Sequence, residues 1–300
     1  MASPFRPAGL LVPLVTPFDE RDRVDLGALE ALAASVLAEG AAGVVALATT
    51  GEPTSLDEAE RDSVVAACAR VCADHGAVLL VGAGTNDTRT TIARHERLAG
   101  VPGVAASLAV VPYYVRPSEA AVVAHFGAVA ARSPVPLVVY NIPYRTGRGL
   151  GAAALLELAG VDGVAGLKQA VGALDADTLE VLAGAGDRLA VLGGDDPFLL
   201  PVVLMGGTGA VAASSHLCTG RFATMLAHGA RGEVAPARRH AEALLPLVLA
   251  LFAEPSPAVL KAMLHDAGRI ATPAVRMPLA DASPGATARA LQALATARSC

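Results

Sequence analysis

Residues 136–168, PLVVYNIPYRTGRGLGAAALLELAGVDGVAGLK, contain a complete strand–helix–strand repeat and decide the fold class. Two short apolar runs, 136–143 and 163–168, flank a segment with helical patterning. Both runs are apolar along most of their length, which is typical of strands covered on both faces of a parallel sheet. Neighbouring parallel strands need a crossover connection, usually a helix. The stretch therefore predicts one βαβ unit.

The same alternation repeats along the chain. Further apolar runs that close on Gly, Pro, Thr, Asn or other small or polar residues predict strands at 10–18, 43–52, 77–86, 104–114, 189–196 and 206–214. Three helix starts are predicted at Asp25, at Ser118, and at Ser55 with Glu58 as a capping box. Eight such units over about 215 residues predict an α/β fold, a (β/α)8 TIM barrel. The alternative is an open doubly wound sheet, but no GxGxxG turn opens the first helix.

Residues beyond 219 carry only helical patterns, for example at 235–254 and 257–268. Because no further strand signal occurs there, these residues cannot belong to another βα repeat. We therefore expect two regions, a barrel at 1–219 and a C-terminal helical region at 220–300.

Composition argues against several classes of protein. A net charge of -5 and 3% aromatic residues provide neither the basic surface nor the stacking side chains that nucleic-acid binding requires. The apolar run near the N-terminus is broken by Pro13 and Pro17, which fits neither a secretory signal nor a membrane span. We expect a cytoplasmic protein with no nucleic-acid or membrane partner.

The cysteines and histidines form no metal-binding pattern. Cys68 and Cys72 can share a helix face, but no second pair accompanies them, and Cys218 and Cys300 are distant in sequence. The seven histidines form no HExxH or similar cluster. We expect ordinary thiols, no metal and no organic cofactor.

Polar side chains collect where the predicted strands end, and in a (β/α)8 barrel the C-terminal strand ends carry the chemistry. All four tyrosines lie in or just after two of these endings. The polar residues at the endings are Thr16, Thr49, Thr50, Glu52, Tyr113, Tyr114, Tyr140, Asn141, Arg145, Lys168 and Asp195.

Lys168 is the most informative of them, because the chain has only one other lysine, Lys261. Side-chain alternation places Lys168 on the same strand face as Gly166 and Val164, pointing into the barrel. Apolar surroundings favour the neutral amine and lower its pKa. A neutral amine attacks a carbonyl to form a Schiff base, which acidifies the adjacent carbon. The alternative is a lysine that reaches solvent or pairs with a carboxylate such as Asp195.

Two other strand endings offer partners for this amine. Tyr140 ends the preceding strand, beside Lys168, and can relay a proton. Thr49 and Thr50 suit a small carboxylate, and Arg145 suits a second one. Taken singly, each has an ordinary alternative: a core aromatic, a plain turn or a surface arginine. Their conjunction at strand ends favours a catalytic site.

The motifs ATTGE, VPYYVRPS, YNIPYRTG, GLKQA and GGDD, in this order and at these separations, resemble the dihydrodipicolinate synthase and N-acetylneuraminate lyase family of pyruvate-dependent class I aldolases. The resemblance extends from about residue 8 through the C-terminal helices. It implies a (β/α)8 barrel, usually a homotetramer built as a dimer of dimers, in which Lys168 forms an imine with pyruvate.

The resemblance also implies a role for each remaining site residue. Arg145, two residues after the YNxP motif, resembles the synthase branch, where this arginine binds the carboxylate of L-aspartate 4-semialdehyde. The implied reaction gives 4-hydroxy-tetrahydrodipicolinate, which leads to diaminopimelate and lysine. The proton relay would consist of Tyr140, Thr49 and, from a neighbouring subunit, Tyr114; Thr49 and Thr50 would hold the pyruvate carboxylate, and the backbone at Gly194 and Val211 would line the pocket.

Several positions depart from the family pattern. Ala48 replaces the usual glycine and Gln169 the usual acidic residue, and we expect both to alter the pocket wall. Pro53, Glu58 and Arg61 stand where lysine-inhibited relatives carry small or histidine residues, so inhibition by lysine is expected to be weak or absent.

Two alternative functions stay open at this point. The first is a sibling aldolase or dehydratase that acts on a sugar-derived 2-keto acid. The second is a catalytically inactive barrel that serves as a binding or regulatory subunit. The joint retention of the lysine, the tyrosines, the threonine and the arginine argues against the second.

Overall fold

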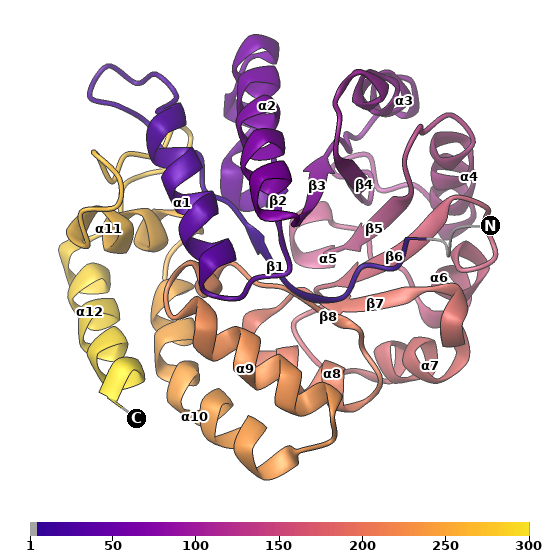
Figure 1. Cartoon of the computed structure of the whole chain (residues 1–300). Helices are drawn as coiled ribbons and strands as arrows, with labels where there is room; N and C mark the ends of the chain where they lie inside the picture. The colour runs from indigo at the N-terminus through magenta and orange to yellow at the C-terminus, as the bar shows by residue number, and fades with distance from the viewer. Residues whose placement is uncertain (1–4, 300) are drawn as a thin grey trace.

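Eight parallel strands close into a barrel in sequence order, with β8 pairing to β1 (Figure 1). The structure is a computed structural model that describes residues 5–299. It confirms the predicted (β/α)8 barrel and all eight predicted strands. The strands are β1 (Gly9–Pro13), β2 (Gly43–Ala46), β3 (Val78–Gly82), β4 (Val104–Val110), β5 (Leu137–Asn141), β6 (Val164–Gln169), β7 (Ala190–Gly193) and β8 (Gly209–Val211).

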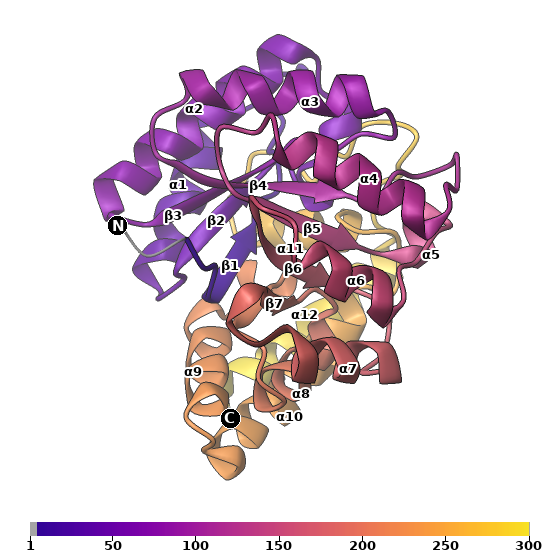
Figure 2. The ribbon, with the colours of Figure 1, turned by 90° about the vertical axis from the view of Figure 1, so that its right-hand side faces the viewer.

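Helices surround the strands as an outer ring, seen edge-on in Figure 2. A short helix, α5 (Pro143–Thr146), follows β5 directly at the carboxyl end of the barrel. The ring consists of α1 (Leu26–Ala38), α2 (Glu58–His75), α3 (Thr88–Arg97), α4 (Glu119–Ala130), α6 (Ala152–Leu158), α7 (Ala176–Ala185), α8 (Leu199–Leu204) and α9 (Thr219–Ala230).

The predicted helix starts are right in two cases and wrong in one. The side chains of Asp25 and Ser118 accept N-terminal N–H groups of α1 and α4. Helix α2 does not start at Ser55, because residues 53–55 form a separate 3₁₀ turn. Asp57 is the N-cap instead, and it forms a reciprocal capping box with Glu60.

The strands bury two apolar layers. One set of side chains, which includes Leu11, Leu80 and Val138, fills the barrel interior, and the alternate set packs under the helices. Val164 belongs to the second set, contrary to the prediction that it shares a face with Lys168. The register between β5 and β6 shifts at this point, so alternation does not carry across it.

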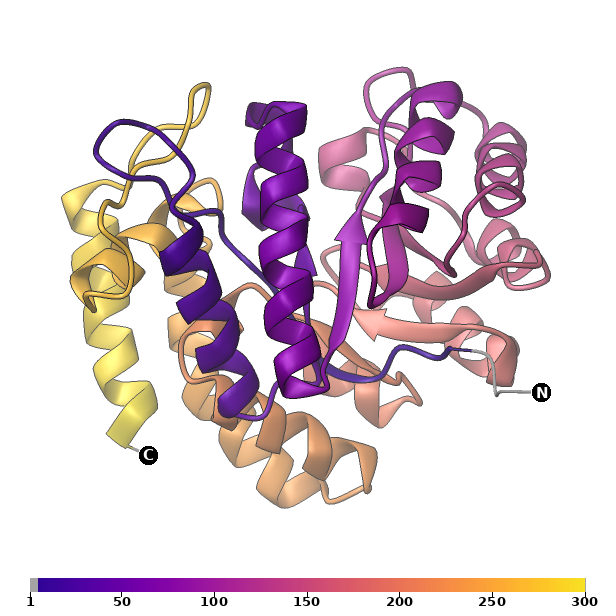
Figure 3. The ribbon, with the colours of Figure 1, turned by 45° about the horizontal axis from the view of Figure 1, so that its top comes forward.

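The C-terminal extension folds back against the start of the barrel. It contains α10 (Val234–Leu251), α11 (Ala258–Asp266) and α12 (Pro284–Ser299). Figures 1 and 3 show the yellow α11 and α12 beside α1, and these helices share an apolar cluster with Leu32 of α1. Because α9 contacts β1 and β8, we propose that it completes the helical ring and that the extension begins with α10.

The structure also bears on the classes that composition argues against. Within residues 5–299, no helix has the length and apolar character that crossing a bilayer requires. Nor do His, Cys, Asp or Glu side chains in this range gather in a group of three or more suited to a metal. Burial raises the pKa of Cys68 to about 12 and that of Cys72 to about 11. Both are therefore ordinary thiols, whereas Cys300 lies outside the described residues.

Candidate active site

A cavity of about 410 Å³ opens at the carboxyl ends of the strands. Its wall contains seven of the eight predicted site residues, brought together from five strand endings. These are Thr49, Thr50, Tyr140, Arg145, Lys168, Gly194 and Val211.

Lys168 lies on the inner wall of the barrel near the base of the cavity. It is paired in register with Tyr140, and its Nζ lies 4.1 Å from the centroid of the Tyr140 ring. The side chain is 4% exposed, and burial lowers its pKa from 10.5 to about 8, although the nearby Asp196 and Asp195 oppose this fall. The sequence predicted both the inward direction and the lowered pKa.

Gly194 allows Lys168 to adopt this position. The Gly194 N–H donates to the carbonyl of Gln169 over 2.8 Å, which brings the β7 ending close to β6. A Cβ at residue 194 would lie 2.9 Å from both Cγ and Cε of Lys168. Since real Cβ contacts are essentially never that short, a side chain here would displace the lysine.

Tyr140 packs its phenol ring against the amine. Burial raises the pKa of this phenol, and a side-chain hydrogen bond with Thr49 partly offsets the rise. The phenol is therefore protonated at neutral pH and is connected through Thr49 to the turn that follows β2. A proton can move between two such hydroxyls without passing through bulk water.

Thr49, Thr50 and Gly51 form a 3₁₀ turn, η1 (Thr49–Gly51), directly after β2. Thr50 is buried and Thr49 is half-buried. The Thr16 hydroxyl, from the end of β1, donates to the Gly51 carbonyl over 2.8 Å. Thr16, another polar strand-end residue, therefore braces this turn.

Arg145 lies at the mouth of the cavity on α5. It is exposed, and its guanidinium lies over the ring of Tyr144, 4.9 Å from the ring centroid. Its positive charge also lowers the pKa of Lys168 by electrostatic repulsion. The cavity thus has an amine near its base and a permanent cation at its mouth.

Tyr114 is the predicted site residue that does not line this cavity. Its backbone is left-handed, with φ at 71°, and its side chain is 87% exposed. Its N–H donates to the Thr146 carbonyl over 3.3 Å, which holds the β4–α4 loop beside α5. Its contribution to a neighbouring subunit stays a prediction.

Sequence reasoning missed several residues of the wall. Asp196, the second aspartate of GGDD, is buried and accepts the Ser214 N–H over 2.7 Å; burial raises its pKa. The motif itself contained that signal. Phe198 follows the same motif at the end of β7. Long-range packing, which leaves no local pattern, brings Val248, Leu249, Phe252 and Ser256 to the wall.

The prediction that Gln169 alters this wall is wrong. Gln169 points away from the cavity, because it follows the inward-facing Lys168 on the strand. Its amide accepts from Asn141 and donates to Thr178 of α7, both over 3.0 Å. Ala48 does not line this cavity, but it lines an adjoining one that shares Thr49, Tyr140 and Arg145 with it. The predicted effect of Ala48 on the pocket wall therefore stays a prediction.

Comparisons with known proteins agree with this geometry. Residues 6–297 match the model of the dihydrodipicolinate synthetase family. Over 286 residues, the chain is 37% identical to 4-hydroxy-tetrahydrodipicolinate synthase of Synechocystis sp., covering 95% of this chain and 93% of that protein. It is 36% identical over 288 residues to the enzyme of the same name from Thermomicrobium roseum, covering 96% and 94%.

Solved structures give the same result. The crystal structure of the chloride-inhibited dihydrodipicolinate synthase from Acinetobacter baumannii, complexed with pyruvate, matches with a TM-score of 0.93 and 28% identity, covering 97% of this chain and 99% of that one. The lysine-bound enzyme from Cyanidioschyzon merolae matches with a TM-score of 0.92 and 31% identity, covering 97% and 98%.

Proposed function

Because this chain belongs to the dihydrodipicolinate synthetase family, whose members are pyruvate-dependent aldolases, we propose that it condenses pyruvate with L-aspartate 4-semialdehyde. The product would be 4-hydroxy-tetrahydrodipicolinate, on the route to diaminopimelate and lysine. The observation that carries the proposal is the buried Lys168 amine, with its pKa lowered to about 8, beside the Tyr140 phenol.

Lys168 would supply the electron sink. Its neutral amine adds to the keto carbon of pyruvate, and loss of water leaves a protonated imine. Loss of a methyl proton then gives an enamine, whose carbon attacks the aldehyde carbon while the aldehyde oxygen takes up a proton. Displacement of Lys168 from the imine carbon by the substrate's own amino group closes the ring and frees the enzyme.

Tyr140 and Thr49 would move the protons in these steps. The hydrogen bond between their side chains and the raised pKa of Tyr140 support a phenol that donates first and recovers its proton afterwards. Thr49 and Thr50 would bind the pyruvate carboxylate, with Gly194 and Val211 lining the cavity beside it. Tyr114, exposed in one chain, would complete the relay in a neighbouring subunit of a homotetramer.

Arg145 would select the aldehyde. Its guanidinium at the cavity mouth suits a carboxylate at the far end of a short substrate, which aspartate semialdehyde has. A sugar-derived keto acid, the alternative substrate, presents hydroxyl groups there. We propose that the protein works in the cytoplasm, where this pathway operates.

Borohydride reduction in the presence of pyruvate tests the core of the proposal. We expect a mass gain of one pyruvic acid less one oxygen, confined to the peptide that contains Lys168. No gain would refute the aldolase mechanism and favour a binding barrel.

Steady-state assays with Arg145→Ala test the substrate. We expect intact pyruvate trapping and a loss of about 100-fold in kcat/KM for aspartate semialdehyde, because a bidentate ion pair is lost. Arg132→Ala, which removes an exposed arginine just before the start of β5, is the control. Preference for a sugar aldehyde, or loss of trapping in Arg145→Ala, would contradict the assignment.

A further inference from the structure

The second lysine of the chain, Lys261, holds the turn that carries Thr49 and Thr50. Lys261 lies on α11 of the C-terminal extension and is fully buried. Its Nζ donates to Glu52 Oε1 over 2.9 Å, and the Glu52 side chain is 1% exposed. We propose that Lys261 is a positioning residue for the carboxylate-binding turn. This inference rests on the proposed function, because it takes Thr49 and Thr50 as the pyruvate ligands.

Glu52 links two successive 3₁₀ turns, η1 and η2 (Pro53–Ser55). Its backbone is left-handed, with φ at 52° and ψ at 44°, which is uncommon for any residue other than glycine. Its N–H donates to the Thr49 carbonyl over 3.1 Å and so closes η1. The shape of η1 therefore depends on whatever keeps Glu52 in this conformation.

Two groups of the C-terminal extension hold the Glu52 carboxylate. Lys261 binds one oxygen, and the backbone N–H of Arg276 donates to the other over 2.8 Å. The ring of Phe18 contacts both cations, with its centroid 4.0 Å from Lys261 Nζ and 4.3 Å from Arg276 Cζ. Both oxygens of Glu52 are thus fixed from one side.

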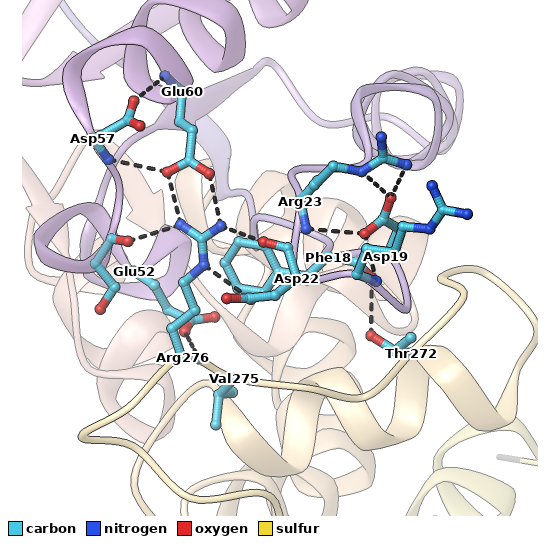
Figure 4. A network of polar contacts seen from close by, with 12 residues as sticks. Phe18, Asp19, Asp22, Arg23, Glu52, Asp57, Glu60, Thr272, Val275 and Arg276 are labelled. Carbon is cyan, nitrogen blue, oxygen red and sulfur yellow. Dashed lines mark hydrogen bonds and ion pairs between the residues drawn. The ribbon is translucent and has the colours of Figure 1, made fainter.

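Arg276 is itself anchored to the barrel (Figure 4). Its guanidinium donates to both carboxylate oxygens of Glu60, each over 2.7 Å, and to Asp22 Oδ1 over 3.0 Å. It also donates to the Ser55 carbonyl over 2.8 Å, at the end of η2. The extension therefore holds η2 at both ends, at Glu52 and at Ser55.

Stability alone does not account for the buried Lys261–Glu52 pair. Desolvating two charges costs about as much as their attraction returns, and apolar residues of similar volume often stabilise a protein more. What apolar residues cannot supply is direction, because a salt bridge and an N–H bond fix a carboxylate at two defined points. Because Glu52 lies three residues after Thr49, a contact that fixes its orientation also positions the turn that binds the pyruvate carboxylate.

The experiment measures the pyruvate concentration that gives half-maximal borohydride trapping on Lys168, so no aldehyde is needed. Lys261→Met removes the charge at similar length and leaves Lys168 as the only lysine. Glu52→Gln, a milder variant, keeps the size of the side chain but has a single acceptor oxygen. Asp22→Asn, which alters an exposed partner of Arg276 without touching Glu52, is the matched control. All proteins are compared well below their unfolding temperatures.

We expect half-saturation to rise at least about tenfold in Lys261→Met and about threefold in Glu52→Gln, because a misplaced ligand of even 1 Å weakens binding and reaction. Asp22→Asn should match the wild type. Unchanged half-saturation in folded Lys261→Met overturns the inference. If that variant does not fold, unchanged half-saturation in Glu52→Gln overturns it. Absence of trapping in the wild type would instead refute the proposed function.

Discussion

The two lysines are expected to respond oppositely to the same substitution. Lys168 is buried without a close carboxylate partner, and its pKa falls from 10.5 to about 8. At pH 7 the folded protein must keep this amine largely charged in an apolar site, which costs about 3 kcal/mol relative to the unfolded chain. Lys168→Met removes that cost and loses a cation–π contact worth about 1 kcal/mol. We therefore expect the variant to be inactive but about 2 kcal/mol more stable.

The dependence on pH identifies the cause. Below pH 8 the lysine is charged in both the folded and the unfolded chain, so the full cost is present. As pH rises from 8 towards 10.5 the unfolded lysine loses its proton as well, and the cost disappears. At pH 9.5 about 1.4 kcal/mol of it remains. The stability advantage of Lys168→Met should therefore shrink as pH rises.

Lys261→Met should destabilise the protein. Burial also lowers the pKa of Lys261, but Glu52 lies 2.9 Å away and opposes the fall. Removing the lysine leaves a buried carboxylate without its partner, which costs about 3–5 kcal/mol. Of the two groups that bind the Glu52 carboxylate, only the backbone N–H of Arg276 remains.

Urea unfolding of the wild type and both variants at pH 7 and pH 9.5 measures these differences. The reasoning is refuted if Lys168→Met is no more stable than the wild type at pH 7. It is also refuted if the advantage of that variant does not change with pH, because the gain would then come from packing alone. If both substitutions changed the free energy of unfolding equally, burial of the lysine, and not its ion pair, would determine the change in stability.

Three further outcomes follow from the site geometry. The rate of pyruvate trapping should rise about tenfold from pH 6 to pH 7 and level off above pH 8, as the Lys168 amine becomes neutral; a rate that is flat with pH would contradict the assigned pKa. Gly194→Ala should slow trapping about 100-fold or more, because the new Cβ displaces Lys168, whereas Gly127→Ala, with open space on α4, should leave it unchanged. Gln169→Glu should change pyruvate half-saturation less than about twofold, because the side chain faces Thr178 and not the cavity; a larger change would restore the predicted role in the pocket wall.

Local patterns predicted most of the fold and most of the site. Strands, their order and the inward direction of Lys168 depend on period-two alternation and strand–helix repetition, which short segments contain. Tyr140 and Lys168 meet because consecutive strands of a barrel are neighbours. The orientation of Gln169 was available from the same alternation. The expected role of Gln169 in the pocket wall was instead taken from the family pattern, which disagreed with the strand alternation.

The errors arise where geometry is not local. The shift in register at Val164 depends on how β5 pairs with β6, which no single strand specifies. The start of α2 depends on whether residues 53–55 continue the helix or form their own turn, and Ser55 and Asp57 are both good N-caps. Leu249 and Phe252 reach the cavity mouth only because the C-terminal extension packs across that end of the barrel. Its own helical pattern contains no trace of that contact.

The two lysines differ in how the nearby carboxylates are hydrogen-bonded. Both amines are buried, and each lies about 4 Å from the centre of an aromatic ring. One oxygen of Glu52 accepts a hydrogen bond from Lys261. Asp195 instead accepts the Gly172 N–H over 2.5 Å, and Asp196 accepts the Ser214 N–H. Among the ion pairs of residues 5–299, none includes Lys168. The same residue type is thus a fixed cation in one place and a titratable amine in the other, because the aspartates near Lys168 accept backbone N–H groups and form no ion pair with it.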